Sequence, residues 1–441
     1  MSITKLLQLS GIILLIMIQQ VSAQEHKTTD WNQYLGSDRN AAVDGVAIAH
    51  NWTEKGPDKV WEFKLGQGYG GASVFNGEVF VLDRIIGEAD VLRCIDSSTG
   101  EEKWNYKYEA KGELPYPGSR AVPTVDENYV WCVGPHGHLK CIDKKTHQSV
   151  WSHNLLDEYG GKLQRWGFSV SPIVVDDLVI VSPQGEKAGV VAYNKLTGDV
   201  VWESRRLTGQ RFHVSPTIGE YGGITQIIMT SSCVKGDGFT SDEVVAFEVN
   251  TGKELWRYEG FNSFACIAPP LVLDENRLFL TSCAYKDKYN PVSILLEISS
   301  DGENFAFEEV FRNEEVGCKM HPPVFVNDHF YINNNGRPNE LVCLNLKGER
   351  VWDKQSAPGF EMGSIILVDG LIINQNGKNA DVYLIEPSPE AYKELGKVSL
   401  FESDKSQAWS PMAFSDGKLF VRDMEKMVCV DLVGGAELVK H

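Results

Sequence analysis

An eleven-residue pattern that recurs along the chain restricts its fold more than any other feature. Each copy has a small residue, a polar turn-forming residue two positions later, Thr-Gly or its remnant, and a final Trp. The copies are CIDSSTGEEKW (Cys94–Trp104), CIDKKTHQSVW (Cys141–Trp151), AYNKLTGDVVW (Ala192–Trp202), AFEVNTGKELW (Ala246–Trp256) and the shorter CLNLKGERVW (Cys343–Trp352). Gly100, Gly198 and Gly252 can supply the left-handed backbone of a hairpin turn, and Asp or Asn can hydrogen-bond the turn. Each copy therefore predicts two antiparallel strands with the Trp on the second.

The Trp residues of the repeat follow one another at regular intervals. Intervals of 43 to 54 residues separate Trp61, Trp104, Trp151, Trp202 and Trp256. Trp352 comes two intervals after Trp256, so we expect Phe311 to replace Trp in between, and a degenerate copy to end near Val398. A Trp here can wedge between neighbouring sheets and bury up to about 250 Å². The period predicts small sheets that bury their faces against one another.

A second landmark marks the start of the innermost strand of each unit. The eight starts are Ala72-Ser73, Val122-Pro123, Ser171-Pro172, Ser215-Pro216, Pro269-Pro270, Pro322-Pro323, Gly363-Ser364 and Ser410-Pro411. Outer strands also number eight, but only if the strand from Val60 to Leu65 is counted, and that strand precedes the first unit. We expect it to complete the last unit, whose third strand ends near Asp431, and so to close a ring without exposed sheet edges.

The rest of the chain predicts little regular structure. The best helix candidate is SPEAYKEL, with Ser388 as N-cap and Pro389 in the first turn. Segments 24–58 and 431–441 are expected to be irregular arms lying on the ring. The sequence thus predicts one all-β domain over residues 59–441, preceded by an N-terminal arm over 24–58.

The first 23 residues resemble a cleavable signal peptide. Lys5 precedes an apolar run from Leu6 to Ile18, and Val21-Ser22-Ala23 offers small residues for cleavage before Gln24. The run is shorter than the roughly 20 residues of a membrane span, although an uncleaved anchor is the alternative. We expect a periplasmic or secreted monomer with no membrane span after signal removal.

The net charge argues against two classes of binding partner, and the positions of the cysteines indicate which of them are structural. A net charge of −18 argues against sequence-independent binding of nucleic acid and against docking on anionic membranes. Four of the nine Cys residues occupy one place in the repeat, so we expect small buried side chains at Cys94, Cys141, Cys343 and Cys429. Cys266 and Cys318, ahead of two successive inner strands, are the first pair to consider for a disulfide.

The eleven-residue motif resembles the tryptophan-docking motif of quinoprotein alcohol dehydrogenases and of the PQQ-like (pyrroloquinoline quinone) repeat family. The resemblance covers nearly the whole chain after residue 23. It includes WNQYLGSDRN (Trp31–Asn40), YPGSRAVPTV (Tyr116–Val125), RWGFSVSPIV (Arg165–Val174) and AWSPMAFSDGKLFVRD (Ala408–Asp423). It implies an eight-bladed β-propeller. One relative by fold is the propeller lipoprotein of the outer-membrane barrel-assembly machinery, whose lipidated Cys this chain lacks.

The resemblance also raises the question of a cofactor. Quinoprotein dehydrogenases hold PQQ with Ca²⁺ or a lanthanide on the propeller axis, against a disulfide between adjacent Cys residues, a stacking Trp and an Asp base. This sequence has no adjacent Cys pair, no long insertions and no Cys-x-x-Cys-His motif for an attached haem. PQQ with Ca²⁺ therefore has no support in the sequence, and we predict no cofactor, metal or catalytic residue.

Two other motifs contain residues that could bind a metal ion, but each is better explained as a loop or a turn. GDGFTSDE (Gly236–Glu243) clusters carboxylates but lacks the ligand register of an EF-hand, so a solvated loop is expected. His136 and His138 could share a strand face, yet GPHGHLK is a Gly-rich hairpin, which favours a turn.

Functional side chains gather in the lead-in segments, the residues directly before each innermost strand. In a propeller these segments converge on the axial funnel. They contribute Tyr69, Arg120, Arg165, Trp166, Phe168, Arg211, His213, Lys319, His321, Glu361 and Trp409. Arg recognises carboxylate or phosphate, aromatic faces stack on rings or sugars, and a positive funnel attracts anions. Alternatively these residues fill the channel, with Arg paired to Glu361 or to backbone carbonyls.

These observations favour an exported, non-catalytic propeller that binds or scaffolds a partner, namely a protein, a glycan or a small anion at the axial funnel. One alternative is an enzyme that uses the funnel, either a PQQ-dependent quinoprotein oxidoreductase or a carbohydrate-active protein. A third interpretation is an assembly factor that works through its rim and loops.

Overall fold

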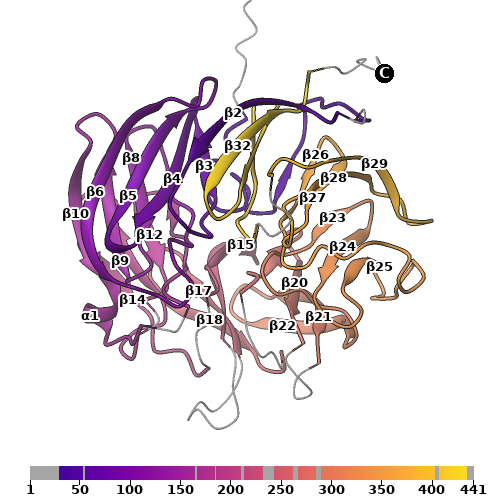
Figure 1. The fold of residues 1–441 in the computed structure, drawn as a ribbon. Helices are drawn as coiled ribbons and strands as arrows, with labels where there is room; N and C mark the ends of the chain where they lie inside the picture. Colours follow the sequence, from indigo (N-terminus) through magenta and orange to yellow (C-terminus); the bar gives the residue numbers. More distant parts are fainter. Residues whose placement is uncertain are drawn as a thin grey trace, which may run out of the picture.

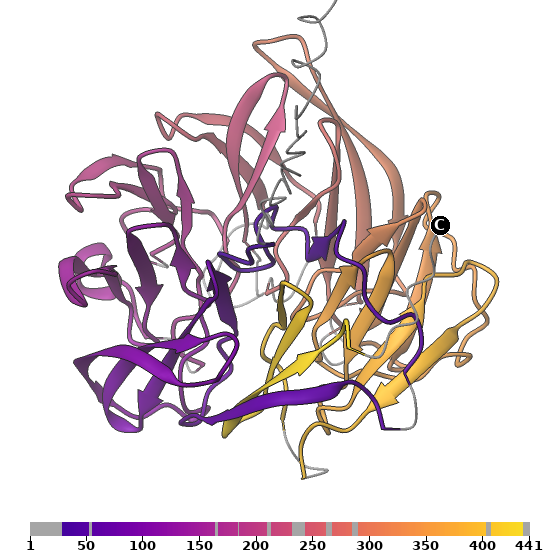
Figure 2. The ribbon, with the colours of Figure 1, turned by 90° about the horizontal axis from the view of Figure 1, so that it is seen from above.

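Eight small sheets stand in a ring around a central axis (Figure 1). The computed structural model describes residues 29–52, 55–163, 166–183, 185–209, 213–231, 243–261, 267–284, 290–402 and 407–434. The predicted signal peptide, residues 1–23, lies outside them. Figure 2 shows the blades arranged around a centre that the indigo N-terminal segment crosses. The predicted eight-bladed, all-β propeller is confirmed.

The blades follow one another along the chain, and the strands within a blade are antiparallel neighbours. Blade 1 comprises β3 (Ala72–Phe75), β4 (Glu78–Ile85), β5 (Gly87–Asp96) and β6 (Glu102–Gly112), and blade 2 comprises β7 (Thr124–Val125), β8 (Tyr129–Val133), β9 (His138–Asp143) and β10 (Gln148–Asn154). Blade 3 comprises β11 (Ile173–Val175), β12 (Leu178–Val181), β13 (Val191–Asn194) and β14 (Val200–Glu203), and blade 4 comprises β15 (Thr217–Tyr221), β16 (Ile224–Ser231), β17 (Glu243–Glu248) and β18 (Glu254–Tyr258). Blade 5 comprises β19 (Leu271–Val272), β20 (Arg277–Ser282), β21 (Val292–Ser300) and β22 (Phe305–Asn313), and blade 6 comprises β23 (Val324–Val326), β24 (His329–Asn334) and β25 (Glu340–Asn345). Blade 7 comprises β26 (Ile365–Val368), β27 (Leu371–Gln375), β28 (Val382–Glu386) and β29 (Lys393–Val398), and blade 8 comprises β30 (Ala413–Ser415), β31 (Lys418–Arg422), β32 (Lys426–Asp431) and β2 (Asp58–Lys64).

The N-terminal strand closes the ring, as the count of strands predicted. β2 pairs antiparallel with β32, so that Trp61 lies opposite Cys429. In Figure 1 the indigo β2 lies beside the yellow β32. The last blade therefore takes its outer strand from the other end of the chain.

Most Trp residues of the repeat pack against the turn of the next blade. The indole N–H donates to a backbone carbonyl at 2.9 to 3.0 Å in four of these contacts: Trp61 to Ser97, Trp151 to Lys195, Trp202 to Val249 and Trp352 to Ser388. The turn glycines lie under the rings, because a Cβ at Gly100, Gly198 or Gly252 would stand 2.4 to 2.8 Å from an indole carbon. Phe311 packs on Gly348 in the same way, which confirms it as the substitute for Trp. Trp256 differs, since its indole donates to the side chain of Gln226 in its own blade.

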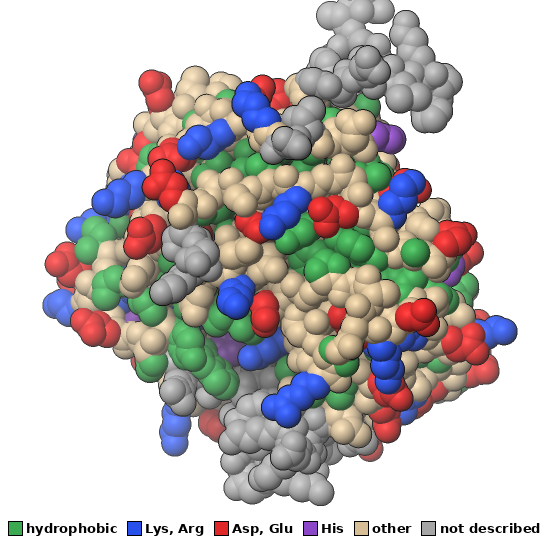
Figure 3. Space-filling model, turned by 45° about the vertical axis from the view of Figure 1, so that its right-hand side comes forward, with side chains coloured by type: hydrophobic (Ala, Val, Ile, Leu, Met, Phe, Trp, Pro, Cys, Tyr) green, Lys and Arg blue, Asp and Glu red, His purple; other side chains and the backbone are tan. Residues whose placement is uncertain are grey.

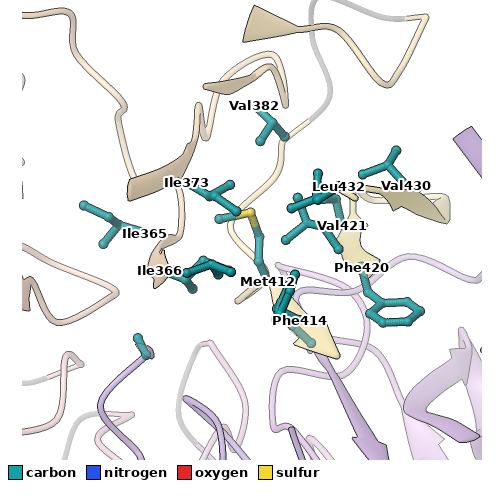
Figure 4. Close-up of a cluster of buried hydrophobic side chains, with 14 of the residues drawn as sticks. Ile365, Ile366, Ile373, Val382, Met412, Phe414, Phe420, Val421, Val430 and Leu432 are labelled. Atoms are coloured by element: carbon teal, nitrogen blue, oxygen red, sulfur yellow. The ribbon is translucent and has the colours of Figure 1, made fainter. Parts of the chain in front are cut away.

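The blades bury their apolar faces against each other. Figure 4 shows the seventh and eighth blades, where Met412 lies between Ile366 and Ile373 on one side and Val421 on the other. Similar clusters fill the spaces between other neighbouring blades. These apolar cores fix neighbouring blades against each other, and the blades hold the lead-in segments in place.

The predicted helix at Ser388 is wrong. Residues 389–391 form a bend, and β29 follows, paired with β28. The blade needs an outer strand here, and pairing along β28 outweighs the weak local helix preference of SPEAYKEL. The one helix in the described part of the chain is α1 (Leu155–Tyr159), capped by Asn154.

The N-terminal arm runs through the ring, whereas the sequence predicted that it lies on it. Trp31 forms a bridge to Val74 of β3, and the short strand β1 (Ala42–Val43) pairs in parallel with β26. Trp31 is 1% exposed. The arm therefore fills part of the channel between the innermost strands.

Cysteine placement agrees with small buried side chains. Cys94, Cys141, Cys343 and Cys429 are fully buried, free thiols. Cys318 is also a free thiol, with its Sγ 2.8 Å from the carbonyl oxygen of His321, and Cys266 lies outside the described residues. No helix among the described residues is both long and apolar enough to cross a membrane.

Candidate functional site: an axial cavity lined by all eight blades

A cavity of about 330 Å³ opens on the axis at the end of the ring where the innermost strands begin. Each blade contributes at least one residue from its lead-in segment, and Tyr34 of the N-terminal arm joins them. This volume lies within the usual range for small-molecule sites, about 300 to 1,000 Å³. The cavity is therefore large enough for a small organic ligand.

The structure brings together most of the predicted funnel residues. Seven line the cavity: Tyr69, Arg120, Trp166, His213, Lys319, His321 and Trp409. Arg165 and Arg211 lie outside the described residues, and Phe168 is buried in the core beneath the site. That the seven contact a ligand stays a prediction.

Glu361 does not line the axial cavity. Its backbone φ is 52°, in the left-handed region, and its N–H donates to Oδ1 of Asn339. This turn directs the exposed Glu361 to a separate polar pocket that it shares with Asn339, Asn376 and Lys378. Glu361 forms no ion pair with Arg120 or Lys319 within the described part of the chain, although its carbonyl oxygen accepts from Asn335, which also binds the N–H of Lys319.

Serine side chains hold successive lead-in segments together. The Oγ of Ser171 accepts from the N–H of Val122, and the Oγ of Ser215 accepts from the N–H of Ser171, both at 2.9 Å. In the same way, the Oγ of Ser364 accepts from the N–H of Met412. These landmark serines thus satisfy buried backbone donors in a neighbouring blade and fix the wall of the cavity.

One wall of the cavity is aromatic. The rings of Tyr69 and Trp409 stack with centroids 5.3 Å apart and planes inclined by 20°. Trp166 meets the imidazole of His213 edge-on at 5.7 Å. Aromatic faces in a concave site favour a ligand with a planar or apolar body.

Arg120 is held in place without a carboxylate. Its Nη1 donates to the carbonyl oxygen of Gly118 at 2.5 Å and its Nη2 to that of Tyr116, and its guanidinium lies 5.7 Å from the ring of Tyr69. Burial lowers the pKa of Arg120 to about 10. The backbone carbonyls orient the guanidinium, as the channel-filling alternative proposed, but they leave its charge unneutralised.

Two imidazoles in the wall each keep one ring nitrogen without a partner. Nδ1 of His213 shares a hydrogen bond with the hydroxyl of Ser169 at 2.6 Å, and Nε2 of His321 donates to the carbonyl oxygen of Trp409 at 3.1 Å. Nε2 of His213 and Nδ1 of His321 have no hydrogen-bond partner among the described residues. Burial lowers the pKa of both to about 4, so both are neutral at pH 7.

The charge of the lining is opposite to that of the protein. Arg120 and Lys319 line the cavity, and no Asp or Glu does among the described residues. Lys319 forms no ion pair within the described part of the chain. By contrast, Figure 3 shows side chains of both signs interspersed over the face that it displays. A positive cavity in a chain of net charge −18 favours an anion.

The arm supplies the floor and a further buried cation that the sequence did not reveal. Below Tyr34 in the same arm, Arg39 is 4% exposed and donates to Gln33 Oε1 at 3.1 Å and to the carbonyl oxygen of Pro216 at 2.8 Å. Burial lowers the pKa of Arg39 to about 10. The arm carries no repeat, so no sequence signal indicated that it enters the channel.

The cavity lining does not fit PQQ with Ca²⁺. Calcium takes six to eight oxygen ligands, mostly carboxylates and carbonyls. The described lining holds no carboxylate, and its single Cys, Cys283, has no adjacent Cys. Elsewhere, His136 lies in a turn, as predicted, and no group of three or more metal-ligating side chains occurs among the described residues. Of the predicted solvated loop Gly236–Glu243, only Glu243 is described.

Comparisons with known proteins agree with this architecture. A family model described as "Outer membrane protein assembly factor BamB" matches residues 48–215 and 117–352. A search among curated proteins finds no significant match.

Several solved structures share the fold at low sequence identity. A quinohemoprotein alcohol dehydrogenase from Comamonas testosteroni is 12% identical with a TM-score of 0.65, over 94% of this chain and 82% of that one. BamB from Moraxella catarrhalis is 12% identical with a TM-score of 0.59, over 87% of this chain and 99% of that one. The computationally designed protein Ika8 is also 12% identical, with a TM-score of 0.54, over 83% of this chain and 98% of that one.

At such identity these structures share only their fold with this chain, and an enzyme, an assembly factor and a designed protein all adopt it. The family match is broader evidence, because its two segments together span more than half of the sequence. This chain is a PQQ-like β-propeller and belongs to the family whose model is described as outer membrane protein assembly factor BamB.

Proposed function

We propose that this propeller is a non-catalytic binding protein outside the cytoplasm, and that its axial cavity takes a small anion with an apolar body. The observation that carries the proposal is the unneutralised charge of Arg120, half-buried in a cavity whose described lining has no carboxylate. A partly desolvated charge without a counter-charge costs free energy, and an anionic ligand would remove that cost.

The lining supports binding in preference to catalysis. The two histidines lie in the wall as neutral groups with a free ring nitrogen, which suits hydrogen bonding to a ligand. No described lining residue is a carboxylate that could serve as a base. The predicted signal peptide and the family description favour a location outside the cytoplasm, in keeping with the expected periplasmic or secreted protein.

A scaffolding role on the rim is the second candidate. Val150 of β10 and three residues of blade 3, Leu196, Val200 and Val201, are 47 to 49% exposed. The indole of Trp151 donates to the carbonyl of Lys195, which joins these two blade edges. Exposed apolar side chains on neighbouring edges suit contact with another protein, in line with the assembly factor named in the family description.

Thermal unfolding with a panel of organic acids and phosphates tests the cavity. A ligand that binds only the folded state raises the unfolding temperature with its concentration. We expect stabilisation of the natural chain by at least one anion, loss of that effect in Arg120→Gln, and retention in Arg206→Gln, which removes an exposed arginine paired with Glu186. Equal stabilisation of Arg120→Gln and the natural chain would overturn the proposal.

A further inference from the structure

We propose that the ligand of the axial cavity carries two acidic groups at opposite ends of an apolar body. This inference rests on the proposed function and specifies its ligand class. It follows from where the two cationic side chains of the lining stand in the ring.

The first cation belongs to the side of blades 1 and 2. Arg120 precedes β7 of blade 2, and its guanidinium lies 5.7 Å from the ring of Tyr69, which precedes β3 of blade 1. Its bonds to the carbonyls of Tyr116 and Gly118 fix it on this side. Two nitrogens are thus used for positioning, and the remaining donors of the guanidinium are left for a ligand.

The second cation belongs to the side of blades 5 and 6. Lys319 precedes β23 of blade 6, and its N–H donates to Oδ1 of Asn335 at 2.8 Å. Its ammonium acts on Cys283, which directly follows β20 of blade 5: burial raises the pKa of that thiol, and Lys319 partly offsets the rise. The first observation fixes the backbone of Lys319, and the second places its charge at this side of the cavity, whose lining includes both Lys319 and Cys283.

In a ring of eight blades, units that are four apart face each other across the axis. Blades 1 and 2 are therefore opposite blades 5 and 6, so the lead-in segments that carry the two cations face each other across the axis. The crossing direction is lined differently, by the stacked Tyr69 and Trp409 on one side and by Trp166 with His213 on the other. The space between the cations is thus apolar and aromatic.

A ligand with one acidic group leaves one of these charges unneutralised. No described Asp or Glu lines the cavity at either end, so no described carboxylate neutralises the second charge. A molecule with a carboxylate or phosphate at each end pairs with both cations, while its middle contacts the aromatic walls. The two acid types share this chemistry, and the experiment below includes both.

Calorimetric titration of the natural chain separates one-ended from two-ended ligands. The probes are succinate, adipate, suberate, sebacate and terephthalate, each matched with its monocarboxylate: butyrate, hexanoate, octanoate, decanoate or benzoate. Hexane-1,6-diyl bisphosphate and hexyl phosphate form the phosphate pair. We expect one length of diacid to bind at least about tenfold tighter than its one-ended match, as a desolvated ion pair provides. Equal affinity of every matched pair would overturn the inference.

Variants of Lys319 and Arg120 test which cation pairs with which acidic group of the ligand. Lys319→Met should reduce the best diacid to the affinity of its monoacid and leave the monoacid unchanged, whereas Arg120→Gln should weaken both. Lys319→Glu should instead favour an ω-amino carboxylate of the same length, which a merely structural role for Lys319 would not produce. Arg206→Gln is the control and should change nothing. If mono- and diacids bind equally and Lys319→Met has no effect, the two-ended ligand is wrong while the proposed binding function stands. If neither class binds, both fail.

Discussion

The indole of Trp104 stacks on the imidazole of His147, with ring centroids 4.6 Å apart and planes inclined by 11°. His147 occupies the turn position that is Gly in the other complete copies of the repeat, and its φ is 57°. The stacking contact offsets the free-energy cost of a left-handed backbone at a residue other than glycine. We expect His147→Ala to keep the backbone strain, lose the stack and destabilise the fold by about 1 kcal/mol. His147→Gly loses the stack but relieves the strain, so the free energy of unfolding in urea should change less than in the Ala variant.

Gly252 should tolerate a methyl group far less well than another glycine of the same conformation. Its φ is 68°, and a Cβ would stand 2.4 Å from the ring of Trp202. Gly223 has a φ of 72° and nothing within 4 Å of a Cβ. Gly223→Ala should therefore cost about 1 kcal/mol for backbone strain alone, and Gly252→Ala about 2 to 4 kcal/mol because the docked indole must move. Equal costs in urea unfolding would show that the indole contact contributes nothing.

Trp61 should stabilise the fold more than its neighbour on the closing strand. Trp61 is 7% exposed and rests on Gly100, whereas Val60 is 40% exposed. We expect Trp61→Ala to destabilise the protein by about 3 to 5 kcal/mol and Val60→Ala by less than about 0.5 kcal/mol. Chemical denaturation followed by Trp-independent far-ultraviolet circular dichroism measures both. Similar small effects would mean that closure depends on the backbone pairing alone.

The fold should lose stability in mild acid because of the cavity histidines. Burial lowers the pKa of His213 and His321 from 6.5 to about 4. The unfolded chain takes up protons as the pH falls through about 6.5, while the folded chain does so only near 4. The stability that these neutral imidazoles contribute is thus present above pH 6.5 and lost as the pH drops toward 4. By pH 5 the loss is on the order of 2 kcal/mol for each histidine.

Substitution isolates that contribution. His321→Gln should flatten the decline of the free energy of unfolding between pH 7 and pH 5. A decline that is identical in the variant and in the natural chain would assign the acid sensitivity to other groups.

The ring was predictable from the sequence because its determinants are local and repeated. The turn glycines, the docking Trp and the Ser-Pro starts each act within one unit or between neighbours, so their period is visible in the chain. The funnel residues were predictable for the same reason, since every lead-in segment meets the axis. Arg39 could not be anticipated, because the path of its arm is set by contacts with distant strands such as β26.

Two of the differences between expectation and structure have the same origin. Glu361 was assigned to the funnel from its distance to an inner strand, but its backbone is left-handed and it lines a separate polar pocket. The helix at Ser388 was proposed from local preference, whereas pairing with β28 decides that segment. In both cases a neighbouring element overrides what a few consecutive residues favour.

The pairing of β2 with β32 has a consequence for the order in which this protein forms. Asp58 lies opposite Asp431, so the strand that emerges early from the ribosome finds its partner only when nearly the whole chain has been made. Until then the last blade lacks its outer strand and presents a free edge, which is prone to pairing with other chains. Completion of the last blade thus joins the beginning of the propeller to its end, and it can follow only after nearly the whole chain has been made.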